Sequence, residues 1–170
     1  MLEVGCSKGY LLEEASNHFD VEGIDISEYA ISAASSAIRS KVAVADLEEV
    51  DLAQETYDVV VAFNILEHLR HPEAAVAKVR RSLKQGGFLI GSVPNNTRPL
   101  TRLFTWVTNL IDRTHRSTFS AEGWRHVFLK AGYRRIEFFG EIPAGMNHCW
   151  YLKGSIWRHC ALNLMFVCWK

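Results

Sequence analysis

Three acidic residues near the start of the chain lie where a ligand could be bound. Glu3, Asp25 and Asp46 each come at or near the end of a short apolar segment with the composition of a strand. The carboxyl ends of parallel strands meet at one edge of a sheet, so we expect these carboxylates to lie close together. Three negative charges would repel a pyrophosphate and would favour a ligand with net positive charge.

A glycine-containing loop follows the first of these segments. Gly5 and Gly9 bracket it, and glycine lets the backbone approach a ligand closely. Asp25 follows Gly5 by 20 residues, where an acidic side chain can accept hydrogen bonds from ribose hydroxyls. The dinucleotide pattern G-x-G-x-x-G fails because Ser7 and Tyr10 occupy its third and sixth positions, and no phosphate loop with Gly-Lys-Ser/Thr is present. This combination favours S-adenosylmethionine, which has a ribose, a sulfonium and an ammonium but no phosphate. Each carboxylate alone would instead indicate a solvated strand end.

Apolar segments of strand length alternate with helical patterns along the whole chain. This alternation predicts an α/β fold, a Rossmann-like doubly wound sheet of seven strands with helices on both faces. The predicted strands are residues 1–4, 21–26, 41–45, 57–63, 88–93, 133–139 and 162–169.

Several residues mark the ends of the predicted helices. Ser27 is a predicted N-cap, and Pro72 suits the first turn of a helix that Gly86-Gly87 would end. Ser120 is a second predicted N-cap, with Phe119 and Trp124 spaced as a hydrophobic staple.

Five segments in this order resemble the motifs of class I S-adenosylmethionine-dependent methyltransferases, in particular the small-molecule branch of methyltransferase 11/12 type. The resemblance covers nearly the whole chain and implies that the last strand enters the sheet antiparallel, between strands five and six. The motifs are residues 2–9 (LEVGCSKG), 23–27 (GIDIS), 45–47 (ADL), 57–60 (YDVV) continuing to 66–69 (LEHL), and 83–89 (LKQGGFL), and residues 119–132 resemble the late helix.

The resemblance also implies a cofactor and its contacts. The cofactor would be S-adenosylmethionine and the product S-adenosylhomocysteine. Ser7 stands where the family motif has its middle glycine. In the family a helix usually precedes the first strand, so residues 1–170 are expected to form a single methyltransferase domain that lacks this helix. The implied cofactor-binding residues are Glu3, Gly5, Cys6, Ser7, Gly9, Asp25, Ile26, Asp46, Leu47 and Asn64.

Two histidines are candidate catalytic bases. Methyl transfer to a hydroxyl or amine requires removal of a proton, and histidine is suited to this near neutral pH. His68 follows the fourth predicted strand, and His115 precedes the late helix; a structural role is the alternative for His68. No metal site is expected. A metal site usually shows two closely spaced pairs of ligands, and neither His68 with His71 nor His148 with Cys149 belongs to such an arrangement.

Composition limits the partners and the compartment. Nineteen Lys and Arg balance nineteen Asp and Glu, and a net charge of zero argues against general nucleic-acid binding. The four cysteines form no C-x-x-C pair, which is typical of a reducing compartment, and we expect a cytoplasmic protein. An apolar helical stripe over Leu100–Asp112 predicts a packed helix or lid, or alternatively a surface for a hydrophobic acceptor or for peripheral contact with a membrane.

Three functional hypotheses follow. The first is an S-adenosylmethionine-dependent methyltransferase acting on a small, hydrophobic or aromatic acceptor through an oxygen, nitrogen or carbon nucleophile. The second is a methyltransferase-like domain that binds the cofactor without turnover and acts as an interaction or regulatory module. The third, a nicotinamide-dependent oxidoreductase, is disfavoured by Glu3 and by the failed dinucleotide pattern.

Overall fold

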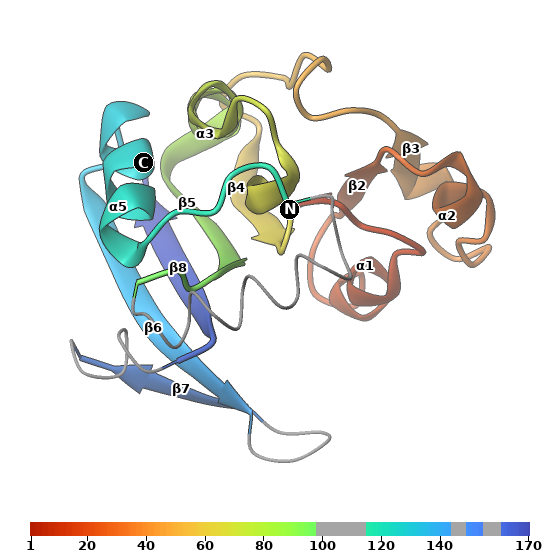
Figure 1. The fold of residues 1–170 in the computed structure, drawn as a ribbon. Helices are drawn as coiled ribbons and strands as arrows, with labels where there is room; N and C mark the ends of the chain where they lie inside the picture. Colours follow the sequence, from red (N-terminus) through yellow and green to blue (C-terminus); the bar gives the residue numbers. More distant parts are fainter. Residues whose placement is uncertain (98–114, 144–148, 155–160) are drawn as a thin grey trace.

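The structure is a computed structural model that describes residues 1–97, 115–143, 149–154 and 161–170 (Figure 1). The strands in these residues form one eight-stranded sheet in the order β3-β2-β1-β4-β5-β8-β6-β7. The strands are β1 (Leu2–Val4), β2 (Glu22–Asp25), β3 (Val42–Val44), β4 (Tyr57–Phe63), β5 (Leu83–Pro94), β6 (Arg135–Pro143), β7 (Cys149–Lys153) and β8 (Asn163–Trp169).

The sheet confirms the predicted doubly wound fold and the placement of its last strand. β3, β2, β1, β4 and β5 pair in parallel, and β8 lies antiparallel between β5 and β6. The chain order reverses direction between β1 and β4, which makes this the switch point of the sheet.

The predicted count of seven strands was wrong, since the described residues form eight. The additional strand, β7, pairs antiparallel with β6 at the edge of the sheet. Trp150 and Tyr151 of β7 are both exposed. An edge strand with aromatic residues exposed lacks the alternation of buried and exposed positions that identifies strands in a sequence.

Helix ends follow the predicted caps at three positions and differ at one. Ser27 accepts a hydrogen bond from the Ala30 N–H, and Ser120 from the Gly123 N–H. Pro72 begins its helix as predicted, but that helix ends at Ser82 rather than at Gly86-Gly87. The chain enters β5 directly at Leu83, because this residue already pairs with Tyr57 of β4. The helices are α1 (Tyr10–Ala15), α2 (Glu28–Ser32), α3 (Pro72–Ser82) and α5 (Ala121–Lys130), with 3-10 turns η1 (Arg39–Lys41) and η2 (Leu66–His68).

Two hydrophobic clusters show that helices cover both faces of the sheet. The smaller cluster joins Leu12 of α1 to Ile31 of α2 and to Val21 before β2. The larger joins Val76 of α3 and Phe128 of α5 to the central strands, and α3 and α5 pack against each other (Figure 1). The larger cluster thus covers the face of the sheet that carries Leu2 of β1 and Val60 of β4, and the smaller one lies beside β2.

Part of the sequence prediction lies outside the described residues. This holds for the apolar stripe over Leu100–Asp112 and for His148. Among the helices that the structure does describe, none is long and apolar enough to cross a membrane.

Candidate cofactor site and its histidine cluster

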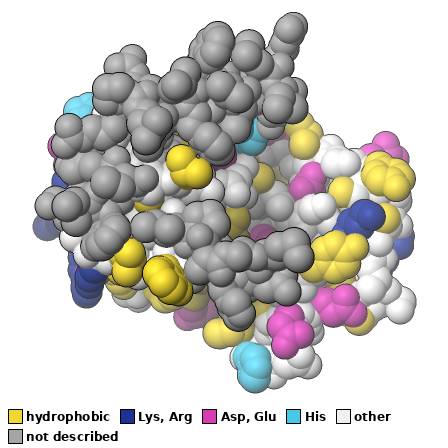
Figure 2. Space-filling view, turned by 60° about the horizontal axis from the view of Figure 1, so that its bottom comes forward, with side chains coloured by type: hydrophobic (Ala, Val, Ile, Leu, Met, Phe, Trp, Pro, Cys, Tyr) yellow, Lys and Arg dark blue, Asp and Glu magenta, His cyan; other side chains and the backbone are white. Residues whose placement is uncertain are grey.

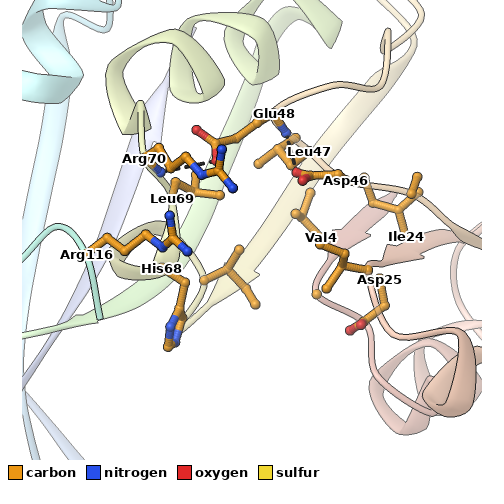
Figure 3. A pocket seen from close by; sticks show the side chains of 14 residues that line it. Val4, Ile24, Asp25, Asp46, Leu47, Glu48, His68, Leu69, Arg70 and Arg116 are labelled. Atoms are coloured by element: carbon orange, nitrogen blue, oxygen red, sulfur yellow. Dashed lines mark hydrogen bonds between the residues drawn. The ribbon is translucent and has the colours of Figure 1, made fainter. Parts of the chain in front are cut away.

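A cavity of about 300 Å³ opens at the carboxyl ends of β1, β2 and β3, beside the switch point (Figure 3). This is where ligands bind in doubly wound folds. The first half of its wall comes from the ends of these strands and the second half from the turn after β4 and one residue before α5. The lining residues are Val4, Gly5, Ile24, Asp25, Ile26, Ala45, Asp46, Leu47, Glu48, Ile65, His68, Leu69, Arg70 and Arg116.

Asp25 is fixed in position by two backbone groups. The Ser7 N–H donates to its Oδ2 atom at 2.8 Å, and the Ser27 N–H donates to Oδ1 at 2.8 Å. The carboxylate thus joins the glycine loop to the start of α2. Each oxygen still has a second lone pair, so the side chain can accept hydrogen bonds from two hydroxyls of a bound ribose.

The loop from Gly5 to Gly9 has an unusual backbone. Gly5 has φ 74°, and a Cβ atom there would collide with the Ile65 side chain. Ser7 has φ 49°, in the left-handed region that residues other than glycine seldom adopt. The bond from the Ser7 N–H to Asp25 holds this conformation, which explains how the chain keeps the loop with serine in place of glycine.

Only part of the predicted cofactor set lines the cavity. Gly5, Asp25, Ile26, Asp46 and Leu47 do so. The other five lie off the lining.

Three of those five belong to the loop, namely Ser7, whose N–H donates to Asp25 as described above, and Cys6 and Gly9. The Cys6 thiol is buried against Gly23 and Leu12, and burial, with the negative charges of Glu3 and Asp25, raises its pKa to about 12. Gly9 faces Ile38 and precedes α1.

Asn64 and Asp46 differ in their relation to the cavity. Asn64, in a left-handed turn after β4, is exposed, and its Oδ1 accepts a hydrogen bond from the Ser92 hydroxyl at 3.1 Å. The Oδ1 atom of Asp46 accepts a hydrogen bond from the Glu48 N–H, which shapes the turn after β3 at the cavity wall.

Glu3 lies in β1, directly before the loop, and is 8% exposed. Burial, with the negative charge of Asp25, raises its pKa from 4.5 to about 7. The folded chain therefore binds a proton that the unfolded chain has lost between these pH values.

We expect Glu3→Gln to remove a pH dependence of stability. For a carboxyl whose pKa is raised on folding, the free energy of unfolding falls as pH rises from about 4.5 through about 7. The neutral amide does not titrate. The free energy of unfolding of the variant should therefore exceed that of the wild type above about pH 7 and equal it near pH 4.5. Urea unfolding at both pH values measures the difference, with the exposed Glu14→Gln as control. A difference that is equal at both pH values would contradict the protonation of Glu3.

The opposite wall of the cavity is basic. Arg70, Arg116 and His68 stand across the cavity from Asp25 and Asp46 (Figure 3). Sequence reasoning missed both arginines, because their positions depend on contacts between distant segments.

Two backbone arrangements hold this wall in place. The Glu48 carboxylate accepts hydrogen bonds from the N–H groups of Arg70 and His71, at 3.1 and 2.7 Å. The Arg116 and Ser117 N–H groups both donate to the Glu67 carbonyl at 2.8 Å. The second contact ties the segment before α5 to η2.

This second contact brings the two candidate catalytic histidines together. The ring centroids of His68 and His115 lie 4.8 Å apart, although 47 residues separate them in the chain. Both histidines are partly buried, and the Glu67 side chain beside them is 1% exposed. His71, the other histidine considered with His68, is exposed. The sequence predicted no metal site, and Glu67 was not among the predicted site residues.

A family model described as a methyltransferase domain matches residues 1–137. The chain belongs to this family. The predicted membership in the class I S-adenosylmethionine-dependent methyltransferases and the predicted cofactor are therefore confirmed.

Two relatives of known sequence are similar to this methyltransferase domain over part of their length. A malonyl-[acyl-carrier protein] O-methyltransferase of Paenibacillus sp. is 26% identical over 153 residues, covering 80% of this chain and 55% of that protein. A ubiquinone biosynthesis O-methyltransferase of Paraburkholderia xenovorans is 39% identical over 103 residues, covering 56% of this chain and 44% of that protein. The chain spans about half the length of these relatives.

Solved methyltransferase structures share the fold. An S-adenosylmethionine-dependent methyltransferase from Thermotoga maritima superposes with a TM-score of 0.79 at 19% identity, covering 99% of this chain and 81% of that one. Phosphoethanolamine N-methyltransferase 2 of Haemonchus contortus, in complex with S-adenosyl-L-methionine, gives 0.67 at 20% identity, covering 81% and 34%.

Proposed function

We propose that this methyltransferase domain transfers a methyl group from S-adenosylmethionine to a hydroxyl oxygen of a small, hydrophobic or aromatic acceptor. The observation that carries the proposal is the cavity at the carboxyl ends of β1–β3, with Asp25 fixed at its wall. Two relatives named as O-methyltransferases support oxygen as the acceptor atom.

The cavity residues suit the parts of the proposed cofactor. Asp25 would bind the ribose hydroxyls, and Asp46 and Leu47 would contact the adenine. Gly5 lets the backbone approach the cofactor, and the negative side chains on this wall favour its positive charge. When bound, S-adenosylmethionine supplies a methyl group on a positively charged sulfur.

His68 and His115 would activate the acceptor. His68 lines the cavity, and His115 stands next to it, so both are placed for an acceptor that approaches from this side. A histidine can activate a hydroxyl either by taking its proton or by holding a metal ion that lowers its pKa. Holding the acceptor in line with the methyl group would supply much of the remaining rate.

A small acceptor fits the surface better than a nucleic acid does. The chain has zero net charge. On the right-hand part of the face in Figure 2, acidic and hydrophobic side chains stand next to one another with few basic ones among them. Nucleic-acid binding depends on a concentration of basic groups. We also place the protein in the cytoplasm, a proposal that the free, buried thiols of Cys6 and Cys168 support.

The proposal predicts binding of both forms of the cofactor. S-adenosylmethionine and S-adenosylhomocysteine should each bind one per chain in calorimetry, with NAD as the comparison ligand. Binding of neither would overturn the proposed function, and a preference for NAD would favour the oxidoreductase hypothesis. Methyl transfer from labelled cofactor to a panel of phenols and hydroxy acids then tests the acceptor class.

A further inference from the structure

We propose that Glu67, His68 and His115 bind a divalent transition-metal ion at the edge of the cofactor cavity, where the ion holds the hydroxyl oxygen of the methyl acceptor. The role in catalysis rests on the function proposed above, but the metal site itself is independent of it.

The first argument is the geometry of the three side chains. One ligand atom from each residue lies within 4.8 Å of the other two. A tetrahedral metal ion with bonds of about 2.0–2.2 Å places its ligand atoms about 3.4 Å from one another, so the largest separation must shrink by about 1.4 Å, shared between two side chains. Side-chain movements of less than about 1 Å would therefore close the site around an ion.

The second argument is the kind of ligand. Two imidazoles and one carboxylate form the donor set of catalytic zinc sites and of non-haem iron sites, both of which leave coordination positions open. Imidazole favours transition metals such as Zn²⁺ and Co²⁺ over Mg²⁺, which prefers oxygen ligands alone. Glu67 is 1% exposed, and carboxylates this deeply buried are paired with cations or coordinate metals.

The third argument is how rigidly the ligands are held. Glu67 and His68 are both in the short turn η2. His115 directly precedes Arg116 and Ser117, whose N–H groups both donate to the Glu67 carbonyl. The Ser117 hydroxyl donates to the Leu69 carbonyl at 3.0 Å, a second link between the two segments. The two ligand segments are thus joined by backbone contacts that do not depend on the ligand side chains.

The position of the cluster gives the ion a role. His68 lines the cavity, so open coordination positions of the ion can face the acceptor side. A hydroxyl bound to a divalent ion loses its proton more readily. In the reaction, the hydroxyl proton passes to solvent and an oxygen electron pair forms the new C–O bond. The C–S bond breaks, and its electron pair stays on the sulfur of S-adenosylhomocysteine.

The test measures metal binding directly. The chain is stripped with chelator, then titrated with Zn²⁺ in calorimetry and with Co²⁺ in visible absorption spectroscopy. We expect one ion per chain and a Co²⁺ d–d band. Loss of a partner outside the ligand set already costs 10–100-fold in metal affinity, so His68→Ala and His115→Ala should each weaken Zn²⁺ binding by about 10-fold or more.

Matched variants keep the result decisive. His126 is exposed on α5, and His126→Ala should leave Zn²⁺ binding unchanged. Glu67→Gln should also weaken binding, but Glu67 is buried, so the two partly buried histidines decide the outcome if that variant fails to fold. Equal Zn²⁺ affinity in the wild type and the His68→Ala/His115→Ala double variant would overturn the metal site and favour a general base.

S-adenosylhomocysteine binding to the same metal-free samples separates the two proposals. Cofactor binding without Zn²⁺ binding overturns only the metal site. Zn²⁺ binding that depends on His68 and His115 without cofactor binding supports the site and overturns its catalytic role, together with the proposed function.

Discussion

Asp25→Ala is expected to weaken S-adenosylhomocysteine binding by about 100-fold or more. Hydrogen bonds to a charged group contribute about 1.5–3 kcal/mol each, and the carboxylate can accept one from each ribose hydroxyl. The substitution also removes the acceptor that holds the Ser7 N–H, so the loop would lose its support in the left-handed conformation. Calorimetry on the folded variant measures the loss.

A matched control separates this effect from a general change in charge. Asp58 lies on β4 and forms an exposed ion pair with Lys84 at 2.8 Å, remote from the cavity lining. Asp58→Ala removes the same charge and should leave the affinity within about twofold, since exposed ion pairs contribute little. If Asp25→Ala bound S-adenosylhomocysteine as tightly as this control, the ribose would lie elsewhere in the cavity.

The part of the site that the sequence could predict depends on strand ends. Asp25 and Asp46 follow apolar segments whose pattern identifies them as strands, and the fold places the carboxyl ends of neighbouring parallel strands together. The nearby sequence was also enough to predict the helix caps at Ser27 and Ser120, because each cap joins residues only three positions apart.

The rest depends on contacts between distant segments. The Arg116 N–H donates a hydrogen bond to the Glu67 carbonyl, and this contact holds Arg116 at the cavity wall. No pattern in the nearby sequence predicts that hydrogen bond. The same contact places His115 beside His68, so each histidine was a candidate by itself while their pairing with Glu67 was not predicted. Alternation failed to identify β7 for a related reason: it is a strand through its pairing with β6.

Phe128→Ala is expected to destabilise the domain by about 4 kcal/mol. Truncating a fully buried phenylalanine costs about 3–5 kcal/mol, a large part of the 5–15 kcal/mol that stabilises a typical domain. Phe128 is 0% exposed on α5, and its ring lies beside four other aromatic rings, of which Phe138 and Phe166 belong to β6 and β8. The centroid distances are 6.3 Å to Trp124, 6.3 Å to Tyr133, 6.2 Å to Phe138 and 4.7 Å to Phe166. Urea unfolding gives the change in free energy.

Leu129→Ala, one residue further along α5, is the control because this side chain is 46% exposed and should lose less than about 1 kcal/mol. At a temperature where Phe128→Ala is folded, we expect its affinity for S-adenosylhomocysteine to match that of the wild type within about twofold. Phe128 does not line the cavity, and the segment before α5 is tied to η2 by its own hydrogen bonds. A folded variant with much weaker binding of S-adenosylhomocysteine would mean that the packing of α5 affects the cofactor site. The ends of β1–β3 would then not determine the geometry of the site by themselves.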